Sequence, residues 1–292
     1  PDAISTQRLL AAWQQNAIDY AAMEVSSHGL VMGRVDALDF TVALFTNLSR
    51  DHLDFHGDMA SYADAKARLF QQPGLQVAVI NRDDEYAQWF IDAVPNGVRV
   101  ITYSCSDESA DVYVTSLAAT PMGVDAVLHS PWGSAPIHSP LLGAFNLANL
   151  LGVLASLLAM GQPLNALADA VMKLEPVAGR MQRLGDDSLS VVIDYAHSPE
   201  ALRSALTALR MHCDGKLWCV FGCGGDRDKG KRPQMGQIAE SLADAVIVTS
   251  DNPRHEQPEK IVADIISGMQ RTARIELDRS AAIAEAIALA SP

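Results

Sequence analysis

Cysteine and positive charge are both in short supply in this sequence, and each shortage limits what the protein can be. The 292 residues include four cysteines, too few and too scattered to frame a disulfide-stabilised fold of this size. Lysine and arginine number 22 against 35 aspartates and glutamates, so the formal net charge is −13. Nucleic acids and anionic membranes bind basic surfaces, so neither partner is expected. Reduced cysteines favour a cytoplasmic location.

Long apolar runs and polar low-complexity segments are also missing. No apolar run approaches the roughly 18 residues that span a bilayer, and no G-x-x-x-x-G-K-[ST] phosphate-binding loop occurs. Hydrophobic residues make up 49% of the chain, enough for packed cores, and the length favours two domains. We predict domains at 1–178 and 179–292, separated by a linker around Glu175-Pro176 and Gly179.

Short apolar runs alternate with helical patterns along most of the chain, which predicts an α/β fold. Strands are expected at 20–25, 41–48, 77–80, 98–103, 189–194, 216–222 and 245–249. Helices are expected at 59–72, 85–93, 145–160, 164–173, 200–212, 231–242, 258–269 and 280–290. Alternating residues between 111 and 139, broken by Pro-Met-Gly and Pro-Trp-Gly turns, predict a small antiparallel sheet. The first domain should therefore contain a mostly parallel sheet plus this antiparallel part, and the second should be Rossmann-like.

Two polar segments follow predicted strands of the first domain, where open α/β sheets bind ligands. The segment Glu24–Gly29 contains a carboxylate, two hydroxyls and an imidazole. These residues could form a ligand site, or Ser26 or Ser27 could cap a helix, and the sequence favours both interpretations equally. The segment Thr46–Gly57 carries His52 and His56 at a helical ligand spacing, yet it also fits a solvated loop before a helix. Its residue types suit a borderline transition metal better than Mg²⁺.

Lys66 lies on an apolar helical stripe, where a lysine usually extends to water. The functional alternative is a lysine whose charge is removed or covalently altered. In the second domain, Gly222–Pro233 joins glycines to a basic cluster that could hold an anion. Cys219 and Cys223 lack a second ligand pair, which disfavours zinc. Asp251–Arg254 presents an arginine on a proline turn, suited to a carboxylate, although it also fits a helix-capping turn.

Taken in this order, the segments resemble the Mur ligase family, and within it the MurE branch. The stretches that carry the resemblance are Glu24–Leu30, Thr46–Gly57, Tyr62–Lys66, Gly143–Asn149, Gly179–Gln182, Asp194–Pro199, Gly222–Pro233 and Asp251–Arg254. The family places a phosphate-binding loop upstream of Glu24 and a further motif beyond Pro292, so the chain is expected to be truncated at both ends. On that basis it should bind ATP poorly and turn over little.

The resemblance implies an ATP-dependent ligase that adds meso-diaminopimelate to UDP-MurNAc-L-Ala-D-Glu in peptidoglycan synthesis, and so serves cell-wall biogenesis, cell shape and division. It implies that Glu24, His52 and a carbamylated Lys66 act in catalysis and hold Mg²⁺. The implied ATP contacts are Asn149, Arg180, Asp194 and His197. The implied contacts to the two other substrates are Ser26, Arg34, Arg227, Asp251, Asn252 and Arg254.

One departure and several rivals accompany the resemblance. Met32 stands where some relatives have glutamine, which puts that hydrogen bond to the precursor in doubt because a thioether is a weak acceptor. The rivals are a lysine-adding MurE, a folylpolyglutamate synthetase and an inactive nucleotide-sugar-binding fragment. Asp251–Arg254 argues against the first two, and intact Glu24, His52 and Lys66 argue against the third. A monomer is expected.

Overall fold

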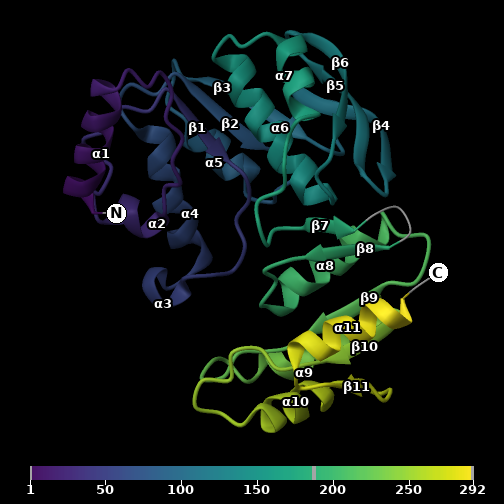
Figure 1. The fold of residues 1–292 in the computed structure, drawn as a ribbon. Helices are drawn as coiled ribbons and strands as arrows, with labels where there is room; N and C mark the ends of the chain where they lie inside the picture. Colours follow the sequence, from purple (N-terminus) through teal and green to yellow (C-terminus); the bar gives the residue numbers. More distant parts are fainter. Residues whose placement is uncertain (1, 186–188, 291–292) are drawn as a thin grey trace. The chain divides into compact units, whose positions relative to one another are not determined.

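The computed structural model describes residues 2–185 and 189–290, which form two compact units (Figure 1). The first unit comprises Pro1–Thr115, Val127–Ala135 and Ala148–Leu167, and the second comprises Ser116–Ala126, Pro136–Leu147 and Ala168–Pro292. The domain boundary at residue 179 stays a prediction. Among the helices described, none has the length and apolar character needed to cross a bilayer.

The larger sheet has six strands that neighbour one another in chain order. They are β1 (Val42–Phe45), β2 (Val77–Asn81), β3 (Arg99–Ser104), β4 (Val112–Thr120), β5 (Gly123–Ser130) and β6 (Gly133–Ser139). The first four pair in parallel. Only Pro121-Met122 and Pro131-Trp132 join the last three, and links this short connect antiparallel strands. The expected mostly parallel sheet with a small antiparallel part is confirmed, and the antiparallel strands continue the parallel ones.

Helices pack on β1 and β2 because alternate side chains of these strands point to opposite faces. On one face, Ala43 and Phe45 join a buried cluster with α4 (Met59–Ala67), the 3₁₀ helix η1 (Arg68–Gln71) and α5 (Ala87–Ala93). On the other face, Leu44 lies under Gly152 of α6 (Ala144–Ala159), whose missing side chain leaves room for this close approach. The remaining helices of the first unit are α1 (Ala3–Gln15), α2 (Ser27–Val31) and α3 (Leu53–His56), together with the first residues of α7 (Leu164–Val171).

The strand predicted at 20–25 is wrong, because residues 17–26 have no regular secondary structure. A strand requires a neighbour for its backbone hydrogen bonds, and β1, at the edge of the sheet, pairs only with β2 among the described residues. Tyr20 and Met23 are consequently 60% and 40% exposed. Elsewhere the predicted ends differ by a few residues: the helices expected to end at 72, 160, 173, 212 and 269 end at Ala67, Ala159, Val171, Arg210 and Ile266.

The second unit contains a parallel sheet in the order β11-β10-β9, formed by Arg274–Ile275, Ala245–Val248 and Trp218–Phe221. Cys219 and Phe221 point into the main core beneath α8 (Pro199–Arg210), α9 (Lys231–Leu242) and α10 (Pro258–Ile266). Trp218 and Val220 point the other way, toward α11 (Arg279–Leu289). Helices therefore cover both faces, as expected of a Rossmann-like domain.

The strand predicted at 189–194 forms as β8 (Ser190–Ile193). It pairs antiparallel with β7 (Gln182–Gly185) in a separate two-stranded sheet. An apolar run predicts a strand but carries no information about its partner, so the sequence did not predict this small sheet.

Helices α9 and α10 approach so closely that their contact requires glycine. A Cβ added to Gly236 would lie 2.2 Å from the carbonyl oxygen of Ile265. Gly236→Ala is expected to lower the free energy of unfolding by about 1–3 kcal/mol through overpacking. This loss should appear even though alanine is normally favoured over glycine within a helix by about 1 kcal/mol.

Gly215→Ala is the matched control, because its added Cβ would meet nothing within 4 Å. It should leave the stability unchanged or raise it by about 0.4–1 kcal/mol. Denaturant unfolding of both variants measures the difference. Equal stability of the two variants would contradict the close helix contact.

Candidate active site

The loop that carries His52 leaves β1 and is fixed by residues at the end of β2. The Asn81 side-chain amide donates to the Thr46 carbonyl at 2.7 Å, and the Leu48 amide donates to the Asp84 carboxylate at 3.0 Å. His52 then adopts a left-handed conformation with φ 54° and begins α3. The His52 ring lies against Tyr62 of α4.

His52 and Lys66 come together around Tyr62 of α4, with Glu24 within electrostatic range of Lys66. The ring centroid of His52 lies 5.9 Å from that of Tyr62, and the Lys66 Nζ lies 5.3 Å from the same ring. Glu24, in the irregular segment before α2, is close enough for its charge to favour the lysine ammonium. The structure thus gathers the three predicted catalytic residues in one region of the first unit.

Burial lowers the pKa of Lys66, and the negative charge of Glu24 only partly opposes this shift. The half-buried lysine is therefore not a side chain that simply extends into water. A lowered pKa increases the fraction of neutral amine near pH 7. A neutral amine can react with an electrophile, whereas an ammonium cannot.

Ser26 and Arg34 flank the short helix α2. The Ser26 hydroxyl accepts from the Gly29 amide at 3.1 Å and caps the helix, so the capping alternative is correct for this residue. Its hydroxyl proton remains available for donation. Arg34 is exposed and donates to the Met32 sulfur at 3.2 Å. The thioether at this position therefore contacts an implied binding residue.

The other histidines of this region form an aromatic cluster. The His28 ring packs against His52, Phe55 and His56 at 5.0, 4.1 and 5.4 Å between centroids. His56 stacks on Tyr62 at 4.9 Å and shares a 2.9 Å hydrogen bond with the Ser27 hydroxyl. Burial lowers the pKa of His56, which favours its neutral form.

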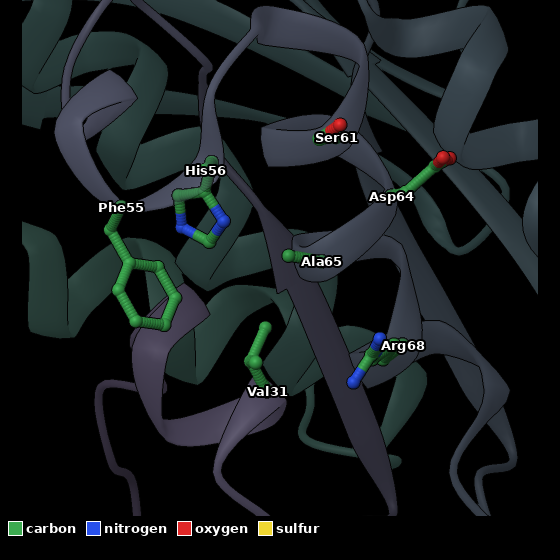
Figure 2. Close-up of a pocket in the computed structure, with 7 residues that line it drawn as sticks. All are labelled: Val31, Phe55, His56, Ser61, Asp64, Ala65 and Arg68. Carbon is green, nitrogen blue, oxygen red and sulfur yellow. The ribbon is translucent and has the colours of Figure 1, made fainter.

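In residues 2–185 and 189–290, no three His, Cys, Asp or Glu side chains are grouped so that they could hold a metal ion. A metal site built from the imidazoles and carboxylates of 51–56 alone is therefore not formed. A shallow hollow of about 380 Å³ lies beside this segment (Figure 2). It is lined by Val31, Phe55, His56, Ser61, Asp64, Ala65 and Arg68. Of its lining residues, His56 is a candidate ligand from the sequence, and none is a site residue that the family resemblance implies.

Two loops of the second unit interlock through their backbones. The Gly225 amide donates to the Asn252 carbonyl at 2.9 Å. A Cβ on Gly225 would lie 1.9 Å from the Pro253 oxygen, and a Cβ on Gly222 would lie 2.3 Å from the Thr249 oxygen. Only glycine fits at these two positions, so the loop after β9 and the turn after β10 are held together.

The interlocked loops carry the predicted amino-acid contacts. Arg254 has a left-handed φ of 50° and donates to the Gly225 carbonyl at 2.7 Å. The Asn252 side chain accepts from the Arg254 amide at 3.3 Å. Asp251 and Arg227 are exposed on the same two loops. The helix α10 begins after Gln257, so the turn at 251–254 is not its cap.

The predicted ATP contacts of the second unit meet at the end of β8. Asp194 accepts from the amides of Met181 and Ala196, each at 2.9 Å. The Arg180 guanidinium lies 4.9 Å from the Tyr195 ring centroid, and His197 bonds the Tyr195 carbonyl at 3.0 Å. Asn149 belongs to the first unit, where it is exposed on α6.

The family model for the Mur ligase middle domain matches residues 1–157. The model described as "Mur ligase, glutamate ligase domain" matches residues 179–292. The chain belongs to the Mur ligase family. Among Mur ligases of known structure, MurF from Acinetobacter baumannii has a TM-score of 0.68 at 18% identity and covers 88% of this chain and 55% of its own. That similarity concerns the fold.

Mur ligases that are more similar to this chain in sequence share the name UDP-N-acetylmuramoyl-L-alanyl-D-glutamate--2,6-diaminopimelate ligase. The relative from Vibrio vulnificus strain YJ016 is 49% identical over 290 residues, which are 98% of this chain and 59% of the relative. The relative from Pseudomonas aeruginosa is 49% identical over 294 residues, 100% of this chain and 60% of the relative. A solved structure so named has a TM-score of 0.77 at 44% identity and covers 98% of this chain and 60% of its own. The chain thus spans about three fifths of the length of these relatives.

Sequence reasoning missed the residues that hold the candidate site in place. Asn81 ends β2 and Asp84 lies shortly after it, at the carboxyl end of a strand, where polar residues indicate a site. Glu256 was also missed. Arg232 belongs to the basic cluster predicted to hold an anion, but it is fully buried and pairs with Glu256 and Asp264. A sequence gives no signal of burial for a charged residue in a helix.

Proposed function

We propose that this chain is part of an ATP-dependent amide ligase that adds meso-diaminopimelate to UDP-MurNAc-L-Ala-D-Glu in peptidoglycan synthesis. The observation that carries the proposal is the grouping of His52 and a lysine of lowered pKa, Lys66, around Tyr62, with Glu24 in electrostatic range. In the same proposal, residues 1–178 form the ATP-binding catalytic domain and 179–292 the amino-acid-binding domain. The ligase acts in the cytoplasm as a monomer.

Lys66 is proposed to react with CO₂. Its neutral amine attacks the carbon, an N–C bond forms, and the nitrogen loses a proton to give a carbamate. The lysine then carries one negative charge, shared between two oxygens, in place of a positive charge. With the Glu24 carboxylate and a His52 ring nitrogen, this donor set suits Mg²⁺ better than the histidine-rich segment alone. When bound, Mg²⁺ neutralises charge on the ATP phosphates.

The remaining contacts are divided among the substrates. Asn149 is proposed to contact the adenine. Arg180, Asp194 and His197, which gather around Tyr195, are proposed to contact other parts of ATP. Ser26 and Arg34 are proposed to hold the UDP-MurNAc dipeptide. The support is that Ser26 keeps its hydroxyl proton free and that Arg34 is exposed.

The amino-acid substrate is proposed to bind the interlocked loops. One Arg254 nitrogen is occupied by the Gly225 carbonyl, and the rest of the guanidinium can grip the distal carboxylate of meso-diaminopimelate. Lysine as a substrate lacks that carboxylate. Arg227 supplies a second cation, and Asp251 and Asn252 supply an acceptor and an amide.

The reaction follows from the low reactivity of a carboxylate toward amines. The γ-carboxylate of the D-Glu residue takes the terminal phosphoryl group of ATP and becomes an acyl phosphate. The amine of diaminopimelate attacks its carbonyl carbon, the amide bond forms, and phosphate leaves with the bonding electrons. Cationic side chains stabilise the charge that develops in both steps.

A chimaera tests the proposal, with this chain replacing the matching stretch of the Vibrio vulnificus relative. Supplied with ATP, Mg²⁺, the precursor and meso-diaminopimelate, it should release ADP and form the amide product, detected by mass spectrometry. L-lysine in place of diaminopimelate should give little product. If the lysine product forms as fast as the diaminopimelate product, the substrate assignment is overturned. If neither product forms, the ligase assignment is overturned.

A further inference from the structure

Arg232 of α9 is a charged side chain with no exposed surface, and it is held by two carboxylates. Its two terminal nitrogens donate to both oxygens of Glu256, at 2.7 and 3.0 Å. They also donate to Asp264 at 2.8 Å and to the Gly224 carbonyl at 3.3 Å. A buried guanidinium requires such partners, because its charge is costly to remove from water.

The two carboxylates differ in what else they contact. Asp264 lies on α10, and its carboxylate meets Arg232. Glu256 also accepts from the Asp226 amide at 2.7 Å and pairs with the Lys229 ammonium at 3.1 Å. These bonds, chiefly those from Arg232, lower the pKa of Glu256 to about 2, so it is ionised at neutral pH. Glu256 therefore joins three segments: its own turn, the loop after β9, and α9.

Glu256 lies close in the chain to the predicted contacts for the amino-acid substrate. It lies two residues after Arg254, whose guanidinium bonds the Gly225 carbonyl of the opposite loop. Between them, His255 bonds the Asp226 carboxylate at 2.7 Å. Glu256 thus ties its own turn to the loop after β9 and to the buried Arg232, and Arg227 directly follows the residue whose amide Glu256 holds.

We propose that Glu256 is a positioning residue that locks the 222–230 loop to the 250–256 turn, and so fixes Arg254 and Arg227 for the carboxylate of the amino-acid substrate. The identity of that substrate rests on the proposed function; the locking of the loops does not. The role of Asp264 is accounted for by balancing the charge of Arg232 alone. Of the two carboxylates on Arg232, Glu256 is the one that also bonds the 222–230 loop, through the Asp226 amide and the Lys229 ammonium.

Three variants of the 292-residue chain separate positioning from charge balance. Glu256→Gln removes the charge, and Glu256→Asp keeps the charge but shortens the side chain. Asp264→Asn removes the other carboxylate from the same arginine without touching either loop. For each variant, amide hydrogen exchange is measured at Gly225 and Asp226, the affinity for meso-diaminopimelate by calorimetry, and stability by denaturant unfolding.

Both Glu256 variants are expected to speed exchange at Gly225 and Asp226 by about tenfold or more, because the loop loses its anchor. They should also weaken binding of meso-diaminopimelate by about tenfold or more. Asp264→Asn should change both quantities by less than about threefold, even where its loss of stability is as large.

The proposal fails if Asp264→Asn loosens the loops as much as Glu256→Gln does, because Glu256 then acts only through the charge of Arg232. It also fails if exchange stays unchanged in both Glu256 variants. If only the Glu256 variants loosen the loops but the unmodified chain does not bind meso-diaminopimelate, the positioning role stands and the proposed amino acid is wrong.

Discussion

Replacing Lys66 with arginine is expected to slow amide formation in the chimaeric ligase by about 10²–10³-fold, comparable with the loss of one transition-state-stabilising group. Arginine preserves a positive charge beside Tyr62, but it cannot form a carbamate because its guanidinium stays protonated. The lysine, in contrast, has a pKa lowered by burial, so its neutral form is available to react with CO₂. Steady-state rates of ADP release and amide formation measure the effect.

Carbamylation is checked directly on the 292-residue chain. With ¹³C-bicarbonate, the unmodified chain should show one carbamate carbon resonance that Lys66→Arg lacks. Because the pKa of Lys66 is lowered, this signal should persist to a lower pH than carbamates of ordinary surface lysines. Arg68→Lys, at an exposed position just after α4, is the control and should retain the resonance. Full activity in Lys66→Arg would remove the carbamate from the mechanism.

Replacing Arg254 with lysine should reduce the preference of the chimaera for meso-diaminopimelate over L-lysine by about 10–10²-fold, because a hydrogen bond to a charged group contributes about 1.5–3 kcal/mol. The ammonium offers a point charge in place of a planar fork, and it also loses the bond to the Gly225 carbonyl. The kcat/KM ratio for the two amino acids measures the change.

The KM for ATP should stay within about twofold in Arg254→Lys, since the proposed nucleotide contacts lie around Tyr195. Arg271→Lys is the matched control, because Arg271 is an exposed arginine paired with Glu240. It should leave the selectivity unchanged. An unaltered preference in Arg254→Lys would take Arg254 out of substrate recognition.

The pattern of apolar residues predicted the elements that depend only on residues close to one another in the sequence. The run at 77–80 became β2, in which every residue is buried, because an apolar stretch of this length between two turns fits a central parallel strand. The similar run at 20–25 stayed irregular because no strand pairs with it among the residues described. The strand β11 was missed because Arg274–Ile275 is too short to show any period.

The residues of the candidate site also fall into two groups, those that the sequence could suggest and those that it could not. Side chains such as Glu24, His52 and Arg254 could be proposed from the sequence because chemistry-bearing residues gather in short segments at the ends of apolar runs, even where the run forms no strand, as before Glu24. The residues that hold those segments could not. Asn81 lies 35 positions from Thr46, and Glu256 lies 24 positions from Arg232, so each contact exists only in the folded chain.

The helix α11 rests on its sheet through two small side chains, Ala282 and Ala286, which cover Ile247. Alanine buries little apolar surface, and Ile283 keeps 41% of its surface exposed. We therefore expect α11 to open before the α8–α10 layer in a local unfolding event, once the contacts of Arg279 with Ser250 and of Glu285 with Arg274 are broken. Its departure would uncover one face of a sheet that stays intact.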